Sequence, residues 1–293
     1  MKHLSGRVAF VTGGSSGIGL GIVKALAREG MRVAFSYRRQ DHLDEAMAHF
    51  EKEPGQAVHP IKLDVTDRAG MAAAKVEVER VYGPVAVLVN NAGVGLFGLV
   101  EQASYGDWDW LMSVNVGGVV NALVTFLPDM IASGRDGHIV NVASMGGIAA
   151  LGSAGIYTTT KFAVVGLSEA LRTDLIGRPV GVSVYCPGMV KSNIGDAGRM
   201  RDERYKDSGY TSPPPPDGPS FMDHAMDAVD AGLHVVRGIR ENQLYILSHP
   251  EFREILRARH GKIERSITDE AVDEARAESV RFILSNPIYS DDA

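Results

Sequence analysis

The sequence predicts an α/β protein with a doubly wound parallel sheet, and three observations support this prediction. Short apolar runs typical of strands alternate with longer runs of helical periodicity, which favours parallel strands joined by crossover helices. The run 85–89 is apolar at every position, as expected for a strand that is covered on both faces. A glycine-rich turn at 13–19 directly follows the first strand, and folds of this class bind ligands at the carboxyl ends of their strands.

The individual elements are expected from changes in the hydrophobic period along the chain. The first helix carries Ile22, Val23, Leu26 and Ala27 at helical spacing and closes at Gly30, a residue that commonly ends helices. The remaining elements are expected as strands at 7–12, 32–37, 58–63, 85–90, 137–143, 180–186 and 243–247, and as helices near 41–53, 67–82, 107–134, 155–177, 221–238 and 268–285.

The chain is expected to form one Rossmann-like domain over residues 1–293, because its length suits a single large domain. Segment 191–224 is polar and contains the consecutive prolines 213–216, which neither a helix nor a central strand accommodates. We therefore expect this segment to be an irregular lid over the substrate. Residues 262–293 are expected to form a C-terminal helical tail, whose apolar stripe would be Val272, Ala275, Val280 and Ile283.

Charge and composition argue against several classes of protein. A net charge of -6 and an isoelectric point near 5.9 disfavour a nucleic-acid partner, because phosphate backbones need a concentrated positive field. The histidines and the lone Cys186 show no metal-binding spacing, and Cys186 is expected to be a buried structural thiol. The N-terminus lacks a signal-peptide pattern, and no apolar stretch is expected to approach the ~20 residues that span a bilayer. We therefore expect a cytoplasmic protein without a membrane partner.

The glycine turn is expected to hold a dinucleotide. Glycines permit positive φ angles and a close approach of backbone to ligand, and the start of the following helix presents unpaired amides to a pyrophosphate. The alternative is a tight turn that binds nothing, but its position between strand and helix favours the binding role. The residues expected to contact the cofactor here are Gly13, Ser15, Ser16, Gly17, Ile18 and Gly19.

The turn has the spacing T-G-x-x-x-G-x-G from Thr12, and other short motifs follow it in order: Asn90–Gly93, Asn115, Ser144, Tyr157 with Lys161, and Pro187–Gly188. With these motifs the chain resembles the short-chain dehydrogenase/reductase family, in its single-domain branch, from about residue 7 to 190. The resemblance implies further cofactor contacts from Asp64 and Val65 at the adenine, from Asn91, Ala92 and Gly93 along the cleft, and from Pro187, Gly188 and Val190 beside the nicotinamide.

The end of the second strand favours NADP(H) over NAD(H). An acidic residue about twenty positions past the glycines would hold the ribose hydroxyls of NAD and repel a 2′-phosphate. Here Tyr37 is followed by Arg38 and Arg39, whose guanidinium groups suit a phosphate. Arg38 is the expected ligand of the 2′-phosphate. NAD stays open as the alternative, since both arginines are also compatible with a solvated strand end.

Four residues are expected to carry the chemistry. Tyr157 and Lys161 lie four positions apart, so they share one face of the predicted helix. A neighbouring ammonium favours the phenolate form, which makes Tyr157 a credible general acid/base, and the resemblance gives Lys161 a bond to the nicotinamide ribose. Ser144 follows a strand and is expected to bind the substrate oxygen. By the same resemblance Asn115 supports a water and proton path to the lysine.

The reaction expected from this set is hydride exchange between a nicotinamide and a secondary alcohol or ketone. A bulky hydrophobic or aromatic substrate is favoured by apolar residues near the reacting carbon. Several stretches, among them 39–46, 107–110, 191–194 and 244–251, resemble the bacterial subgroup that oxidises lignin-derived aryl-ether benzylic alcohols. Beside Ser144 and Tyr157, the residues expected to touch the substrate are Val94, Phe97, Ile148, Met189 and Ile194, with Leu96 and Tyr210 as further candidates.

Three other interpretations stay open at this stage. An NAD-dependent aryl-ether benzylic alcohol dehydrogenase would differ only in its cofactor. A non-catalytic dinucleotide sensor has no need for the tyrosine and lysine, and a sugar-nucleotide epimerase usually carries T-G-x-x-G-x-x-G and a larger C-terminal domain. The partners expected are a small-molecule alcohol or ketone and a second copy of the chain, in a homodimer or homotetramer that the resemblance pairs through the helices near 107–134 and 155–177.

Overall fold

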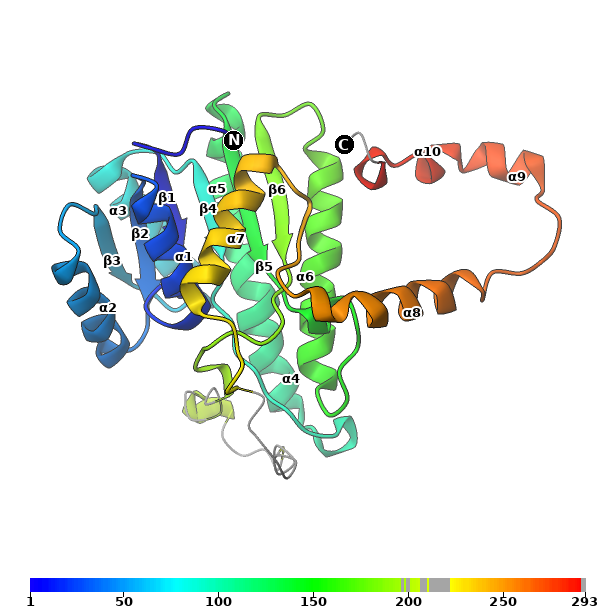
Figure 1. Ribbon diagram of the computed structural model, residues 1–293, viewed down its shortest axis with the longest axis horizontal. Coiled ribbons are helices and arrows are strands. Elements are labelled where there is room, and N and C mark those ends of the chain that lie inside the picture. Colours follow the sequence, from blue (N-terminus) through cyan, green and yellow to red (C-terminus); the bar gives the residue numbers. More distant parts are fainter. Residues whose placement is uncertain (196–197, 199–200, 206–209, 211–221, 291–293) are drawn as a thin grey trace.

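One parallel sheet, with the strand order β3-β2-β1-β4-β5-β6-β7, runs through the computed structural model (Figure 1). The structure describes residues 1–195, 198, 201–205, 210 and 222–290. The order reverses between β1 and β4, and this reversal creates the crevice in which doubly wound folds bind ligands. The predicted fold class is confirmed. The strands are β1 Val8–Val11, β2 Arg32–Tyr37, β3 Val58–Lys62, β4 Val87–Asn90, β5 Gly137–Val142, β6 Val180–Tyr185 and β7 Tyr245–Ile246.

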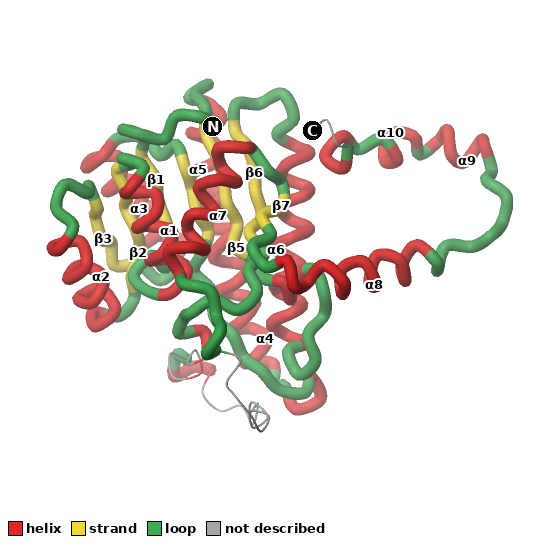
Figure 2. Tube along the Cα trace, viewed as in Figure 1, coloured by secondary structure: helices red, strands yellow, loops and turns green. Residues whose placement is uncertain are grey.

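Helices cover both faces of the sheet and bury two separate apolar clusters (Figure 2). The strands are buried on both sides because successive side chains point to opposite faces: in β1, Val8 and Phe10 join one cluster, while Ala9 and Val11 join the other. Helices α1 Gly17–Arg28, α2 Gln40–Lys52 and α7 Ala228–Glu241 cover one face. The opposite face is covered by α3 Arg68–Tyr82, α4 Tyr105–Met112, α5 Gly118–Ala132 and α6 Gly155–Asp174.

The long helix expected at 107–134 is interrupted. A π-helical turn, Ser113–Gly117, separates α4 from α5, and such turns are often found at functional sites. The whole run Tyr105–Ala132 is long and apolar enough to cross a membrane by length and composition, so the expectation that no stretch approaches that length is wrong. Half of its most apolar window is buried inside the protein, which is the behaviour of a core helix.

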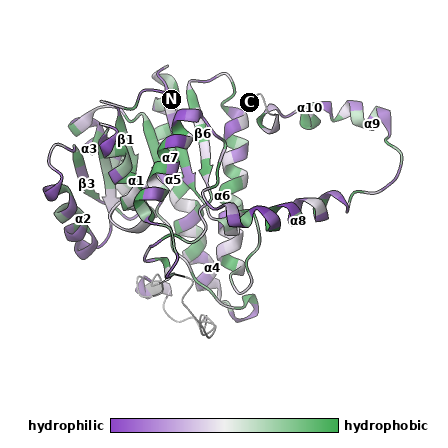
Figure 3. Ribbon diagram, in the orientation of Figure 1, coloured by the Kyte–Doolittle hydropathy of each residue, from purple (hydrophilic) through white to green (hydrophobic). Residues whose placement is uncertain are grey.

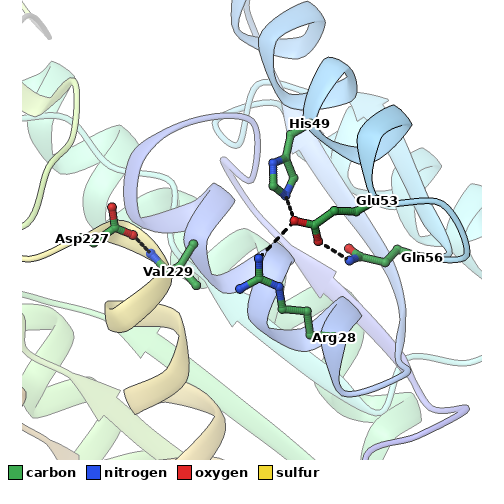
Figure 4. Close-up of polar contacts among 6 residues, drawn as sticks. All are labelled: Arg28, His49, Glu53, Gln56, Asp227 and Val229. Carbon is green, nitrogen blue, oxygen red and sulfur yellow. Dashed lines mark hydrogen bonds and ion pairs between the residues drawn. The ribbon is translucent and has the colours of Figure 1, made fainter.

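Polar contacts hold the C-terminal ends of α1 and α2 and the N-terminal end of α7 (Figure 4). Arg28 at the end of α1 pairs with Glu53 at 3.2 Å, and Gln56 donates to the other oxygen of that carboxylate at 2.8 Å. Asp227 caps α7 by accepting from the Val229 amide at 2.8 Å. Exposed ion pairs contribute only about 0–1 kcal/mol each, so these contacts orient the helix ends more than they stabilise the fold.

The C-terminal region differs from the expected single tail helix. Within its described residues three α-helices form, α8 Arg253–Glu264, α9 Glu274–Ser279 and α10 Arg281–Leu284. Figure 3 shows α8 as largely hydrophilic. The predicted apolar stripe is not buried: Val272 is 72% exposed and Ile283 is 60% exposed. Likewise α7 begins at Ala228, later than predicted. Of the predicted lid 191–224, the prolines 213–216 lie outside the described residues.

Arg201 and Tyr210 attach the described part of the lid segment to the body of the protein. Arg201 forms an ion pair with Asp107 of α4, and its guanidinium also lies 5.3 Å from the Trp110 ring centre. The Tyr210 hydroxyl donates to the Gly98 carbonyl at 2.7 Å. Asp107 is fully buried, and a buried charge requires such pairing. The segment therefore contacts α4 through a desolvated charge pair.

Substitution of Gly21 tests the packing of α1 on α7. A Cβ at Gly21 would lie 1.8 Å from the Ala228 carbonyl oxygen, whereas a Cβ at Gly106 in α4 would meet nothing closer than 3.6 Å. Gly21→Ala is therefore expected to destabilise the protein by about 1–3 kcal/mol, as overpacking typically does. Urea unfolding followed by circular dichroism measures the change. Gly106→Ala is the matched control, and equal stability of the two variants would contradict this packing.

Candidate active site

A cavity of about 360 Å³ lies at the carboxyl edge of the sheet. It extends from the glycine turn after β1 to the side chains that project from α6. All residues that the sequence analysis assigned to the cofactor line it, namely Gly13, Ser15, Ser16, Gly17, Ile18, Gly19, Arg38, Arg39, Asp64, Val65, Asn91, Ala92, Gly93, Tyr157, Lys161, Pro187, Gly188 and Val190.

The glycine turn is shaped by close backbone approaches. Gly13 and Gly17 have φ angles of 64° and 51°, a region that L side chains rarely adopt. A Cβ at Gly19 would lie 2.1 Å from the Gly13 carbonyl oxygen, so only glycine fits there. Ser16 precedes α1 and makes no side-chain cap bond, which leaves the first amides of the helix for a ligand. These features fit a dinucleotide pyrophosphate.

Short side chains from neighbouring strands hold this turn in place. The Asn91 amide nitrogen donates to the Thr12 and Gly13 carbonyls, both at 3.0 Å. The Thr12 hydroxyl in turn accepts from the backbone amides of Asn91 and Ala92, and the Ser36 hydroxyl accepts from the Gly13 amide at 2.9 Å. Asn91 thus acts as a support of the turn as well as a wall of the cavity. Ser36 was not anticipated from the sequence. Its position near the carboxyl end of β2 could have indicated that it lies beside the glycine turn.

Arg38 and Arg39 both reach the cavity from the end of β2. Arg38 pairs with Asp64 at 3.6 Å, and both side chains are about one-third exposed. Arg39 is held by Asp41, with 2.9 Å between Nε and Oδ1, and this bond lowers the pKa of the Asp41 carboxyl. This end of the cavity therefore carries two guanidinium groups, and each of them is paired with a carboxylate.

Tyr157, Ser144 and Lys161 meet at the other end of the cavity. Tyr157 and Lys161 project from α6, and the Lys161 ammonium lies 5.6 Å from the Tyr157 ring centre. Its Nζ donates to the Val142 carbonyl at the end of β5, at 3.0 Å. Ser144 follows β5 and lines the same cavity as Tyr157, and its side chain lowers the pKa of the Tyr157 phenol. The three residues predicted to contact the reacting groups are therefore brought together.

Burial controls the proton affinities of this cluster. Burial lowers the pKa of Lys161 to about 8, because a low-dielectric environment disfavours the charged form. Burial also raises the pKa of the Tyr157 phenol, while the polar side chain of Ser144 opposes this rise. The sequence argument considered only the lowering effect of the ammonium. In this structure desolvation is the larger effect, so the phenol is protonated at neutral pH.

Asn115 lies behind the cavity and does not line it. Its side chain accepts from the Val94 amide at 2.8 Å and donates to the Val94 carbonyl at 2.9 Å. It also donates to the Thr160 hydroxyl at 3.0 Å. The π-helical turn carries this side chain into contact with both the loop after β4 and helix α6. Asn115 thereby links the residue next to Lys161 to the cavity wall at Val94.

Most of the predicted substrate residues line the cavity, but three do not. Val94, Phe97, Met189 and Ile194 are wall residues, and the Phe97 ring centre is 5.8 Å from that of Tyr157. Ile148 instead packs against the apolar core, because the turn after Ser144 directs it inward. The further candidates Leu96 and Tyr210 are buried and absent from the wall. Unpredicted wall residues include Tyr37, His42, Leu151, Ser192, Asn193 and Met222.

Cys186 is fully buried, as expected. Burial raises the pKa of its thiol to about 12, so the reactive thiolate is scarcely populated at neutral pH. Cys186 is therefore a packing residue beneath the cavity.

Comparisons with known proteins agree with this geometry. A family model for short chain dehydrogenase matches residues 7–202. The C alpha-dehydrogenase of Sphingobium sp. strain SYK-6 is 40% identical over 257 residues, covering 87% of this chain and 84% of the relative. The crystal structure of LigO in its apo form, from the same strain, is 41% identical with a TM-score of 0.79, covering 99% of this chain and 100% of that one. A short-chain dehydrogenase/reductase from Burkholderia phymatum in complex with NAD is 31% identical with a TM-score of 0.82, covering 93% and 99%.

Proposed function

Because this chain belongs to the short-chain dehydrogenase family and is an oxidoreductase that acts on alcohol groups, we propose that it uses NADP(H) to interconvert a bulky hydrophobic or aromatic secondary alcohol and its ketone. The observation that carries this proposal is the single cavity that joins two arginines at one end to Tyr157, Ser144 and Lys161 at the other. The cofactor preference and the substrate class are supported by different ends of the cavity.

The cofactor end supports NADP(H). The glycine turn and the first amides of α1 would hold the pyrophosphate, and Arg38 would hold the 2′-phosphate in a charge-assisted bond. Asp64 and Val65 line the same end, where the adenine is expected. The relative from Burkholderia phymatum was solved with NAD, and NAD is the second candidate. The last residue of β2, Tyr37, and the residue after it, Arg38, are not carboxylates, which favours the phosphorylated cofactor.

The residues at the reacting end can move a proton to or from the substrate oxygen. When bound, the dinucleotide supplies the hydride donor or acceptor. Tyr157, whose phenol is kept protonated by burial, would donate its proton to a ketone oxygen, and in the reverse direction would accept one from an alcohol. Ser144 would bind the same oxygen and stabilise the charge that develops on it. Lys161 keeps positive charge beside the phenol and would bind the cofactor ribose. Asn115 would support both the cavity wall at Val94 and helix α6 at Thr160.

The walls beside Tyr157 support an apolar substrate. Val94, Phe97, Met189 and Ile194 surround the reacting end. Among the described wall residues, the charged groups Arg38, Arg39 and Asp64 lie at the adenosine end. Of the described residues at the reacting end, only Lys161 would offer a carboxylate substrate a basic partner. The motifs shared with lignin-related alcohol dehydrogenases and the 40% identity to a C alpha-dehydrogenase favour an aryl-ether benzylic alcohol. A pure dinucleotide sensor is disfavoured by the assembled Ser144, Tyr157 and Lys161.

Loss of the Tyr157 hydroxyl tests the reaction class. Tyr157→Phe removes the proton donor and leaves the ring against Phe97, so turnover is expected to fall about 10²–10⁴-fold while NADPH still binds. NADPH oxidation is followed with a benzylic aryl-ether ketone, a small aliphatic ketone and a ketose, and cofactor binding by fluorescence titration. The aryl ketone is expected to give the highest kcat/KM. Wild-type protein that binds NADPH but turns over none of the panel would favour the sensor instead.

Charge reversal at Arg38 tests the cofactor preference. The wild-type protein is expected to bind NADPH more tightly than NADH, and Arg38→Asp to weaken NADPH binding about 10–100-fold, since a charge-assisted bond contributes roughly 1.5–3 kcal/mol. NADH binding is expected to change little. Dissociation constants for both cofactors are measured by titration, with the distant exposed Arg80→Asp as the control. Equal affinities of the wild-type protein for NADPH and NADH would overturn the assignment.

A further inference from the structure

The C-terminal arm, defined here as residues 253–287, leaves the body of the protein. Figure 1 shows α8 running outward from the side of the molecule next to α6, the chain turning, and α9 and α10 coming back toward α6. No residue of this arm is buried, and between Lys262 and Ser285 only Ala277 and Val280 are even partly covered. The arm is therefore ordered secondary structure with almost no cover from its own chain.

Both ends of the arm are nevertheless attached to α6. At the start of the arm, the Arg259 guanidinium lies 5.2 Å from the Phe162 ring centre. At the end of the arm, Asn286 donates to Thr173 at 3.2 Å. Just beyond it, Ile288 is buried and Tyr289 donates to Glu169 at 3.1 Å. A chain that is fixed at both ends and uncovered between them differs from a frayed terminus.

The arm exposes apolar side chains along its whole length. Phe282 is 78% exposed and Ile267 is 71% exposed. An exposed apolar surface of this extent is typical of a surface that another protein covers. The residues of the arm that are more than half exposed and apolar are Ile255, Ile263, Ile267, Val272, Phe282, Ile283 and Leu284.

The two limbs of the arm carry opposite charge. The first limb, 253–265, contains five arginines and lysines against two glutamates, and the second limb, 269–278, contains five acidic residues against one arginine. Within the described residues, the ion pairs of the second limb are local, between Arg276 and Asp273 and between Arg281 and Glu278. No ion pair joins one limb to the other in the described chain. The complementary charges are therefore available to a partner.

We propose that the arm binds a second copy of this chain, with the basic limb of one copy against the acidic limb of the other. A surface with one basic and one acidic half is complementary to itself after a twofold rotation, which is the requirement of an isologous interface. The exposed apolar residues lie on the same two limbs and would be covered in the same contact. This interface is additional to the pairing of the long helices that the sequence analysis expects, which stays a prediction.

Charge reversal in both limbs tests this proposal. One variant carries Arg257→Glu, Lys262→Glu and Arg265→Glu, a second carries Asp269→Lys, Glu270→Lys and Glu274→Lys, and a third combines all six changes. Molar mass is measured by light scattering after size-exclusion chromatography across a range of concentrations. Each single-limb variant is expected to dissociate at a concentration at least tenfold higher than the wild type, and the combined variant to regain wild-type assembly. Arg237→Glu, an exposed charge on α7, is the control.

Two outcomes would overturn the proposal. If the single-limb variants assemble as the wild type does, the arm has another partner, such as a different protein. If the combined variant stays dissociated while its circular dichroism matches that of the wild type, the two limbs do not face each other. This test requires no enzymatic readout, so its result is independent of the proposed function.

A second inference concerns the loop between β7 and α8 and rests on different contacts. The geometry points to His249 as a positioning residue for the cavity wall at Gly188 and Met189. His249 Nδ1 accepts from the Gly188 amide at 3.1 Å, and its Nε2 is 3.1 Å from the Met189 carbonyl oxygen. A Cβ at Gly188 would lie 2.8 Å from the histidine ring, so the Gly188 backbone packs closely on the His249 ring.

These bonds require one form of the imidazole ring. Because Nδ1 accepts from the Gly188 amide, the ring proton lies on Nε2 and is donated to the Met189 carbonyl. Ser248 adds to this arrangement, since its hydroxyl is 2.9 Å from Nδ1 and 3.0 Å from the Tyr185 hydroxyl. The neutral ring therefore holds two successive wall residues by two bonds of opposite direction. Both of those residues line the reacting end of the cavity.

Three substitutions separate the two bonds. His249→Leu removes both, His249→Asn keeps an acceptor near the Nδ1 position, and His249→Gln keeps a donor near the Nε2 position. Hydrogen exchange of the peptide that contains Gly188 and Met189, measured without cofactor, is expected to accelerate at least tenfold in His249→Leu and to be largely restored at the Gly188 amide in His249→Asn. Exchange in His249→Leu equal to that of the wild type would overturn the inference, as would equal acceleration in the Leu and Asn variants.

The kinetic consequence rests on the proposed function. With an active ketone substrate, His249→Leu is expected to lower kcat at least tenfold while the NADPH dissociation constant stays within about twofold, because the arginines and the glycine turn are untouched. His249→Asn is expected to recover most of kcat. A change in NADPH affinity without a change in kcat would contradict the positioning role. Absence of turnover in the wild type would count against the proposed function and leave the exchange test in force.

Discussion

The arrangement of the cavity depends on an ammonium group that has been withdrawn from water. Lys161 is 4% exposed, and burial lowers its pKa to about 8. A buried charge persists only where hydrogen bonds replace its hydration, and here the Val142 carbonyl provides one. That contact requires α6 to run close to the end of β5. Gly147 permits this approach, because a Cβ there would lie 2.6 Å from the Lys161 carbonyl oxygen.

The sequence predicted those features that are encoded locally. The alternation of apolar strands and periodic helices is visible in any window of the chain, and the glycine turn follows from residues that lie side by side. Every predicted cofactor residue lines the cavity for this reason. The substrate end was harder to predict, because whether an apolar residue such as Ile148 faces the cavity or the core depends on the direction of a single turn. A hydrophobic side chain such as that of Ile148 suits either environment, so its residue type does not distinguish the cavity from the core.

Other features escaped prediction because they depend on contacts distant in the sequence. The π-helical turn at Asn115 is associated with side-chain hydrogen bonds to Val94 and Thr160. The hydrophobic periodicity of the sequence carries no information about such bonds. His249 contacts Gly188 across 61 positions. Helix α8 was missed because its composition is dominated by charge. It packs against the core through Leu256 and has no fully buried residue, so it lacks a broad apolar stripe to detect.

The cofactor end shows how a charge can be both held and available. Arg38 is paired with Asp64, but this partly exposed pair contributes only about 0–1 kcal/mol. A phosphate dianion offers three strong acceptor oxygens to the same guanidinium. The carboxylate therefore keeps Arg38 oriented toward the cavity without binding it so tightly that a phosphate could not compete. An aspartate that was first assigned to the adenine thus has a second effect, on the direction of the neighbouring arginine.

The C-terminal arm and the reacting end of the cavity share one short segment. Phe252 immediately precedes α8, and its ring lies 6.3 Å from that of His249; a Cβ at Gly188 would also meet it at 2.7 Å. An arm covered by a second copy would restrain α8, and through Phe252 it would restrain the histidine that holds Gly188 and Met189. Hydrogen bonds of about 3 Å join His249 to Gly188 and Met189. A small displacement of His249 and Phe252 would therefore shift this part of the cavity wall. If the arm binds a second copy, these contiguous contacts would link assembly to substrate positioning.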